Sequence, residues 1–206
     1  MKIYKYHSIN IHLLNSLRTQ TNWYSKIKYL NDPHECFYID ETNTNVYKEL
    51  ISTLCACCFS KNMDNILMWS HYADGHKGVC LEWEIDWDKL NNQLMPINYD
   101  NTITTLNKVE RLNTGHLSLN SNTNAKFLTQ KFKNWEYEEE IRTYFICEDL
   151  HKKGELNPFL GRLTSIYFGI NANPEDIELV KHIVHYTSEI EYKRVHLDTN
   201  TMKMSI

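Results

Sequence analysis

Acidic and basic side chains are concentrated in residues 135–142, which read Trp-Glu-Tyr-Glu-Glu-Glu-Ile-Arg. In an extended strand successive side chains alternate faces, so Glu136, Glu138, Glu140 and Arg142 would project from one side. Like charges about 7 Å apart on one strand face cost free energy unless water, a cation or a polar ligand compensates them. A packed core disfavours this pattern, and we therefore expect a functional site at this segment.

A second group of aromatic and titratable side chains lies at the end of an expected helix and in the turn after it: Trp69, His71, Tyr72, His76 and Lys77. One interpretation is structural, because Trp69 and Tyr72 are three residues apart on one helix face and would both lie in the core. The two histidines would then cap carbonyl groups at the helix C-terminus, where cations are favoured. The alternative is a binding site, since loops next to regular elements commonly carry binding groups. The sequence leaves both interpretations open.

Cysteine and histidine are close together in one part of the chain, which raises the question of zinc: Cys55, Cys57, Cys58, His71, His76 and Cys80. In a strand Cys55 and Cys57 face one side and Cys58 the other, a poor arrangement for a tetrahedral site, and we expect no bound metal. The sequence has no Gly-x-Gly-x-x-Gly, Gly-Lys-Ser/Thr or Gly-x-Ser-x-Gly motif. This disfavours Rossmann cofactor binding, Walker-type phosphate chemistry and an ordinary α/β-hydrolase.

The composition is that of a globular protein, with 206 residues, 42% apolar and 23% charged residues and a net charge of −4. The acidic balance does not favour nucleic acid as a partner, although short groups of lysines occur. No stretch approaches the roughly 20 apolar residues that span a bilayer, so we expect a soluble, cytoplasmic protein with no membrane partner. The six cysteines, three of them in an apolar run, are expected to be free thiols.

The elements that position these groups alternate between strands and helices. Expected strands cover residues 3–7, 23–25, 54–60, 79–85, 94–99, 139–147 and 165–169, with a C-terminal hairpin of 190–197 and 201–205. Expected helices follow Asn10, cover 44–52, follow Asp64 or Asn65, cover 125–134 and start at Pro174. The polar stretch 101–124 is expected to be a mobile insertion with a helix around 106–112. Together they predict a single α+β domain over residues 1–206, with about eight strands in a mixed, mainly antiparallel sheet and about five helices.

Several short motifs together resemble a bacterial domain family of unknown activity found among phage-defence and abortive-infection genes. They are Ile3-Tyr4-Lys5-Tyr6, Asn31-Asp32-Pro33, Cys57-Cys58-Phe59-Ser60, Met68-Trp69-Ser70-His71-Tyr72-Ala73, His76-Lys77-Gly78 and Trp135-x-Tyr137-Glu138-x-Glu140-x-Arg142. The resemblance covers nearly the whole chain in order. It departs at His7, where the family more often has Arg. It implies a role in defence, with a partner defence protein, but no particular reaction.

The chain also resembles, more distantly, ADP-ribosyltransferases. The likeness rests on His7 in the first strand, Tyr24 or Ser25 in the second, and Glu138-x-Glu140 at the start of a late strand. It implies an ADP-ribosyltransferase-like fold and NAD as the substrate, with a protein or nucleic acid as acceptor. Cleavage of the nicotinamide–ribose bond develops an oxocarbenium-like cation that a carboxylate stabilises.

The resemblance implies roles for several of the candidate site residues. Glu140 would bind ribose and stabilise charge, Glu138 would orient the acceptor, and His7 would hold the dinucleotide. Trp69 or Tyr72 would stack on nicotinamide, and Arg142 would keep Glu140 ionised or bind a phosphate. The expected site thus has the catalytic residues Glu140 and Glu138 and the binding residues His7, Tyr6, Tyr24, Ser25, Asn31, Asp32, Trp69, His71, Tyr72, His76, Lys77 and Arg142.

Two other functions stay open. A metal-dependent nuclease of a defence system would use clustered carboxylates on adjacent strands, and Glu82 with Glu84 share one strand face as Glu138 and Glu140 do. The favoured explanation of Glu82 and Glu84 is the exposed face of an outer strand. A sensor that binds a nucleotide or a phage protein without turnover is the third hypothesis.

Overall fold

The centre of the fold is a sheet of nine strands, arranged in the order β11-β2-β4-β1-β5-β12-β13, with β10 also paired to β4 and β6 paired to β10. The computed structural model describes residues 1–90, 93–106, 126–147, 149–184, 189–201 and 203–206. Within them, neighbouring strands of this sheet are antiparallel except for β12 and β13. The α+β class, the mainly antiparallel sheet and the single domain predicted from the sequence are confirmed.

The strands of the large sheet are β1 (Lys2–His7), β2 (Thr21–Lys26), β4 (Leu54–Ser60), β5 (Val79–Glu84), β6 (Leu94–Pro96), β10 (Glu140–Ile146), β11 (Gly154–Pro158), β12 (Arg162–Phe168) and β13 (Glu191–Arg194). Three smaller pairs are formed by β3 (Tyr38–Asp40) with β8 (Thr104–Leu106), β7 (Asn98–Tyr99) with β9 (Gln130–Lys131), and β14 (His196–Asp198) with β15 (Lys203–Ser205). The helices are α1 (Ile11–Thr19), α2 (Val46–Thr53), α3 (Ile66–Tyr72), α4 (Trp87–Leu90), α5 (Lys126–Thr129) and α6 (Pro174–Ile183), with 3-10 turns η1 (Ile27–Tyr29) and η3 (Lys133–Glu138).

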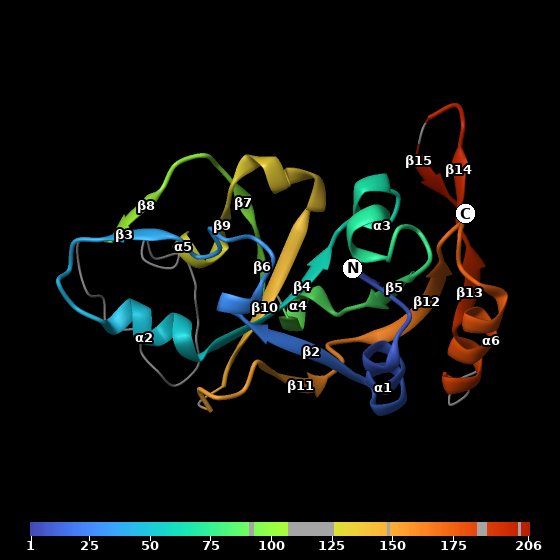
Figure 1. The fold of residues 1–206 in the computed structure, drawn as a ribbon, viewed down its shortest axis with the longest axis horizontal. Helices are drawn as coiled ribbons and strands as arrows, with labels where there is room; N and C mark the ends of the chain where they lie inside the picture. Colours follow the sequence, from blue (N-terminus) through green and yellow to red (C-terminus); the bar gives the residue numbers. More distant parts are fainter. Residues whose placement is uncertain (91–92, 107–125, 148, 185–188, 202) are drawn as a thin grey trace.

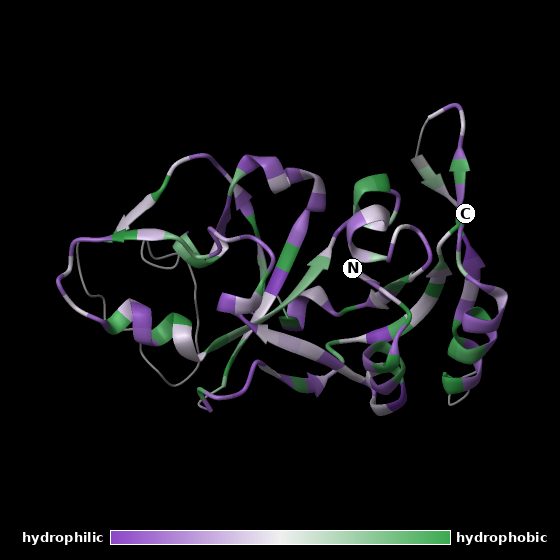
Figure 2. Cartoon of the chain, in the orientation of Figure 1, coloured by the Kyte–Doolittle hydropathy of each residue, from purple (hydrophilic) through white to green (hydrophobic). Residues whose placement is uncertain are grey.

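Helices cover both faces of the sheet. On one face α1 and α6, which lie near one another in Figure 1, place Leu13, Leu17 and Val180 against strand residues such as Ile3 and Phe59. On the other face α3 buries Trp69 and Met68 against β1, β5 and β12, and a separate cluster around Tyr47 and Phe127 packs under the far end of β4. Because side chains alternate along a strand, the strands supply core residues to both faces of the sheet. Figure 2 shows hydrophilic and hydrophobic residues following one another along β10.

Local sequence signals explain the elements that were predicted correctly. Asn10 caps α1 by accepting hydrogen bonds from the backbone N–H groups of His12 and Leu13, and Asn65 caps α3 in the same way. Pro174 begins α6 after the cap Asn173. The apolar run 54–60 forms β4 with the predicted bounds.

Other predicted elements differ in the structure. The expected helix 125–134 is short, because α5 ends at Thr129 and the chain then pairs with β7 as β9. The stretch 94–99 is two strands, and β14 and β15 form the C-terminal hairpin while β13 joins the large sheet in parallel. Residues 104–106 of the expected insertion form β8, paired with β3. The expected helix around 106–112 lies, beyond residue 106, outside the described residues.

Candidate functional site

The sheet divides along one edge of β4. At its start β4 pairs with β2 through Ala56, and at its end it pairs with β1 through Ser60, so the two partners diverge between these positions. The Nζ of Lys5 fills part of the gap by donating a 2.7 Å hydrogen bond to the carbonyl of Cys58. A cavity of about 240 Å³ opens here. The splitting of the sheet therefore creates the site.

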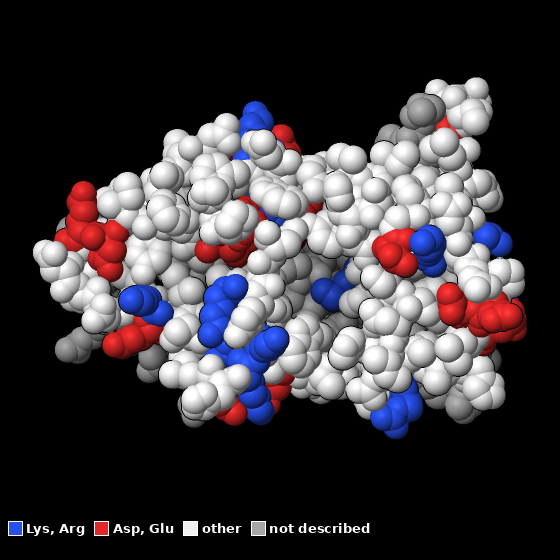
Figure 3. All heavy atoms as spheres, in the orientation of Figure 1, with Lys and Arg blue, Asp and Glu red and all other residues white. Residues whose placement is uncertain are grey.

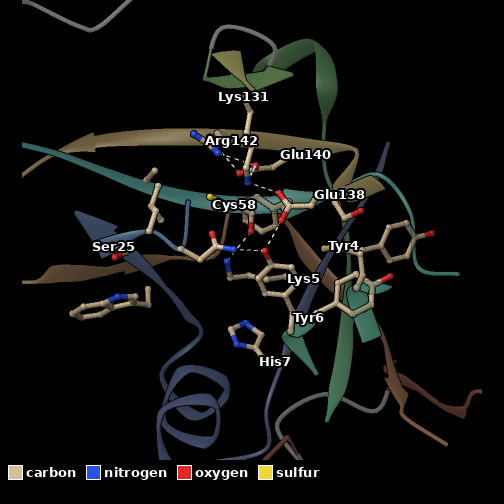
Figure 4. A pocket seen from close by; sticks show the side chains of 18 of the residues that line it. Tyr4, Lys5, Tyr6, His7, Ser25, Cys58, Lys131, Glu138, Glu140 and Arg142 are labelled. Atoms are coloured by element: carbon tan, nitrogen blue, oxygen red, sulfur yellow. Dashed lines mark hydrogen bonds and ion pairs between the residues drawn. The ribbon is translucent and has the colours of Figure 1, made fainter. Parts of the chain in front are cut away.

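Side chains from several separate segments line this cavity. They are Tyr4, Lys5, Tyr6 and His7 of β1, Trp23 and Ser25 of β2, Leu30, Asn31 and Glu35, Ala56 to Ser60 of β4 apart from Cys57, Met68 and Tyr72 of α3, and Lys131, Glu138, Glu140 and Arg142. Figure 4 shows Lys131, Glu138 and Glu140 on one wall, with Lys5 and His7 across from them.

The charged wall begins with Glu140 and Arg142, which lie two residues apart on β10 and face the same side. Arg142 is completely buried. Its guanidinium donates to both oxygens of Glu140, with 2.8 Å from Nη2 to Oε2, and to both oxygens of Glu35, with 2.9 Å from Nη2 to Oε2. Such two-pronged contacts fix planar groups in orientation as well as in place. Arg142 thus holds two buried carboxylates from segments far apart in the sequence.

Glu138 joins this wall through a second cation. The Nζ of Lys131 donates to Glu138 and, at 3.0 Å, to Oε2 of Glu140. It also lies 4.9 Å from the centre of the Trp135 ring. The hydroxyl of Tyr72 donates to the other oxygen of Glu138 and accepts a hydrogen bond from the side-chain amide of Asn31.

The two carboxyl groups have opposite pKa shifts. Burial alone raises the pKa of Glu140, but the charge and hydrogen bonds of Arg142, followed by the charge of Lys131, outweigh it and hold the pKa well below its ordinary value. Burial raises the pKa of Glu138, and Lys131 only partly opposes this effect. Opposite shifts of this kind give two neighbouring carboxyl groups different roles. One remains charged, and the other can exchange a proton.

The opposite side of the cavity carries Lys5 and His7. Burial, followed by the charge of Lys5, lowers the pKa of His7 to about 3, so this imidazole is neutral near pH 7. Among the described residues no carboxylate forms an ion pair with Lys5. Its partners are the Cys58 carbonyl and the ring of Phe59, 5.2 Å from Nζ. The cavity therefore offers an anionic ligand group one cation that has no carboxylate partner.

Most of the residues expected at the site do meet in this cavity. The structure brings together Tyr6, His7, Ser25, Asn31, Tyr72, Glu138, Glu140 and Arg142. The backbone that brings Glu138 to the cavity differs from the expected strand. Residues 133–138 form a 3-10 turn, and Glu139 adopts a left-handed conformation with φ 44°. Glu136 is consequently exposed, whereas Glu138 still turns inward to Lys131.

Three expected site residues lie elsewhere for clear structural reasons. Tyr24 points to the opposite face of β2 from Ser25 and is buried in the core. Trp69 is completely buried in the core under α3, and its indole N–H donates to the carbonyl of Met63. Asp32 is buried outside the cavity lining, where its side chain accepts a hydrogen bond from the backbone N–H of His34.

The histidine turn is also separate from the cavity lining. His71 is exposed, and its ring contacts Tyr72 and Tyr137. His76 adopts a left-handed conformation with φ 68°, and burial lowers its pKa. Lys77 is exposed. The expected convergence of His71 and His76 with the two glutamates is not found.

Sequence reasoning missed the residues that complete the charged wall. Lys131 and Glu35 come from segments with no recognised motif, and Lys5 sits in an ordinary alternating strand. Buried charges need partners of opposite sign. An acidic segment with one arginine therefore indicates that further cations come from other parts of the chain. No local pattern indicates which cations these are.

The carboxylates of the nuclease hypothesis are divided between two places. Glu82 is buried between β1 and β12, where Lys2 pairs with it and Thr164 and Tyr167 donate hydrogen bonds, while Glu84 pairs with Arg162 on the surface. Neither lines the cavity. No group of three or more potential metal ligands occurs among the residues that the structure describes.

Comparisons with known proteins give one match. Residues 68–143 match the model of the family DUF2971, described as a protein of unknown function. The matched region contains Tyr72, Lys131, Glu138, Glu140 and Arg142, and so most of the charged wall. No curated protein and no solved structure matches the chain. Within the described part of the chain, no helix has the length and apolar character needed to cross a membrane.

Proposed function

We propose that this protein is an enzyme that cleaves the nicotinamide–ribose bond of NAD, as an ADP-ribosyltransferase or an NAD glycohydrolase. The observation that carries the proposal is the pair Glu138 and Glu140, whose pKa values are shifted in opposite directions on one wall of a cavity. Glycosidic chemistry commonly uses two carboxyl groups with separate roles, one charged and one exchanging a proton.

The charges of the wall suit a reaction that develops positive charge. Three carboxylates, Glu35, Glu138 and Glu140, face two cations, Lys131 and Arg142, so the group carries one net negative charge when all five are ionised. Because these groups are fixed by hydrogen bonds and buried, they stabilise an oxocarbenium-like ribose without reorganising. The wall thus stabilises the positive charge as it moves from the nicotinamide ring to C1′ in the transition state.

Each carboxyl group takes a different role in this chemistry. The bond between C1′ and the nicotinamide nitrogen breaks, and both bonding electrons leave with neutral nicotinamide. Water or an acceptor hydroxyl then adds to C1′, and its proton passes to Glu138. A raised pKa suits Glu138 to accept this proton, because a general base works best with a pKa near the operating pH. Glu140, held ionised by Arg142, supplies the permanent charge.

Other side chains of the cavity position the substrate. Neutral His7 and the hydroxyl of Ser25 offer hydrogen bonds, and Lys5 offers a charge for phosphate. Metal-dependent nuclease chemistry has less support, because a divalent cation would have to compete with Lys131 and Arg142 for the same carboxylates. We further propose that the activity serves bacterial antiphage defence or toxicity, on the basis of the motif resemblance.

The test is incubation of the purified protein with NAD in the presence of EDTA, followed by mass spectrometry of small molecules and protein. Release of nicotinamide with ADP-ribose, or a mass increase of an acceptor protein, is the expected result. Unchanged NAD with every acceptor would contradict the proposal. Retention of intact nucleotide without turnover would instead identify a sensor, and nucleic-acid degradation that requires magnesium and stops with EDTA would identify a nuclease.

A further inference from the structure

A strip of aromatic and basic side chains adjoins the cavity at the ends of β2 and β11. Trp23, which lines the cavity, and Tyr29, which follows β2, are 46% and 47% exposed. Lys28 and Lys153 lie on Tyr29, with their Nζ atoms 5.0 and 5.7 Å from the centre of its ring. Lys and Arg atoms gather there in Figure 3, beside a hollow in the surface. We call these four residues the rim.

Contacts between β2 and β11 hold the rim together. Lys153 accepts a hydrogen bond at its carbonyl from the backbone N–H of Lys26, which places it beside the end of β2. The next residue, Gly154, leaves room for the indole of Trp23, because a Cβ there would lie 2.6 Å from Cζ2 of that ring. Leu156 pairs directly with Trp23 across the two strands and is 41% exposed. The indole therefore has an exposed, apolar setting at the cavity mouth.

The charges of the rim are not neutralised by acidic neighbours. Within the described ranges neither Lys28 nor Lys153 forms an ion pair with a carboxylate. Lys152, by contrast, lies 3.5 Å from Glu155. Together with Lys5 inside the cavity, the rim offers three cations without a carboxylate partner along one path. Exposed aromatic rings next to lysines are typical of surfaces that bind bases and phosphates.

The size of the cavity indicates which ligand uses this path. Pockets that enclose drug-sized ligands measure about 300–1,000 Å³, whereas this cavity measures about 240 Å³. The cavity is therefore smaller than a pocket that encloses a drug-sized ligand, and a dinucleotide bound there would lie partly outside it. Trp23 lines the cavity and is 46% exposed, so a path leads past this ring from the cavity to the rim.

We propose that the rim is the second nucleotide subsite of a dinucleotide substrate: Lys28 and Lys153 bind its phosphates and Trp23 stacks on its base. This inference rests on the proposed function for the reacting half of the molecule, but the rim itself binds a nucleoside diphosphate whether or not NAD is cleaved. The ligand class is a dinucleotide rather than a polynucleotide, because the net charge of −4 disfavours a long polyanion.

Binding of ADP tests the rim separately from catalysis, because ADP lacks the nicotinamide–ribose bond. Calorimetric titration of the full chain with ADP should give about a tenfold weaker affinity for Trp23→Ala, because this variant loses the stacking of the base on the indole ring. Trp23→Phe should restore most of the affinity. Lys28→Ala with Lys153→Ala should weaken ADP binding and reduce its salt dependence, whereas Lys152→Ala should change it less than twofold.

Three outcomes would overturn the proposal: ADP affinity that is the same in Trp23→Ala and the native chain, equal effects of Lys152→Ala and Lys153→Ala, or a strong preference for a single-stranded oligonucleotide over ADP. Nicotinamide mononucleotide provides the comparison, because it occupies only the cavity and its affinity should not change in Lys28→Ala with Lys153→Ala, two residues outside the cavity lining. If the native protein binds ADP through Trp23 but leaves NAD intact, the nucleotide subsite at the rim is supported and the proposed reaction is contradicted. If NAD is cleaved but the affinity for ADP does not depend on Trp23, the proposed reaction is supported and the subsite at the rim is contradicted.

Discussion

Replacing Glu140 and Glu138 one at a time by glutamine should have very different effects on stability. Glu140 accepts hydrogen bonds from Arg142 and Lys131, both buried cations. Glutamine at this position removes the anion and leaves those cations with fewer partners. Glu138 has a raised pKa, which means that the folded protein already disfavours its charge. Glutamine there removes a charge that burial already disfavours.

The expected magnitudes follow from this difference. Removing one member of a buried ion pair costs about 3–5 kcal/mol, and because glutamine keeps one acceptor oxygen we expect about 3 kcal/mol for Glu140→Gln. We expect about 1 kcal/mol or less for Glu138→Gln, and about 0.5 kcal/mol or less for the exposed control Glu136→Gln. A protein of this kind has a total stability of about 5–15 kcal/mol, so the Glu140 variant remains measurable over most of that range.

Urea unfolding at pH 7 and 25 °C, followed by tryptophan fluorescence, measures these free energies. The pH dependence provides a second comparison. The folded pKa of Glu140 lies below its unfolded value of about 4.3, so its stabilisation is present above that pH and is lost as the pH falls towards the folded pKa. The contribution of Glu138 has the opposite sign: it is present below about pH 4 and is lost as the pH rises through the raised folded pKa. Equal losses for the two variants at pH 7 would refute the assignment of opposite environments.

Three further predictions concern the cavity. The C2 proton of His7 should show no titration between pH 5 and 8 by NMR, because its pKa is lowered to about 3; a midpoint near 6.5 would be inconsistent with its burial. Lys5→Met should weaken binding of nicotinamide mononucleotide about tenfold in a titration, since a charge-assisted hydrogen bond is worth about 1.5–3 kcal/mol; an equal effect of Lys89→Met on the surface would argue against a direct contact. Tyr72→Phe should raise the pKa of Glu138 further, because the lost hydroxyl donates to that carboxylate. An unchanged midpoint in the pH–rate profile of NAD cleavage would show that Tyr72 does not act on Glu138.

The elements that the sequence predicted well are those with strong local signals. The apolar run of β4 predicts a strand from its own residues, and the caps Asn10, Asn65 and Asn173 predict where helices begin. The strand β4 and the starts of these three helices agree with the structure. The 3-10 turn at 133–138 was not predicted. It ends at Glu139, which has a left-handed backbone conformation that is rare for residues other than glycine. Tertiary pairing of β9 with β7 likewise ends the helix that the sequence pattern extends to residue 134.

The candidate site was predictable in part for the same reason. The charge pattern of the acidic segment is unfavourable in an apolar core. This pattern alone identified Glu138, Glu140 and Arg142 as candidate site residues. Their partners Lys131 and Glu35 come together only because of the tertiary fold. The choice between Tyr24 and Ser25, which the sequence left open, is decided by strand alternation once β2 is paired with β4.

The most direct test of the central claim is the rate of nicotinamide release from NAD by the native protein and by the variants Glu138→Gln and Glu136→Gln. Both variants replace a glutamate of the same 3-10 turn, but only Glu138 lines the cavity. We expect release by the native protein, a loss of about 100-fold or more in Glu138→Gln because general-base catalysis contributes at least that factor, and no change in Glu136→Gln. Absence of release from the native protein, or equal rates in the two variants, would contradict it.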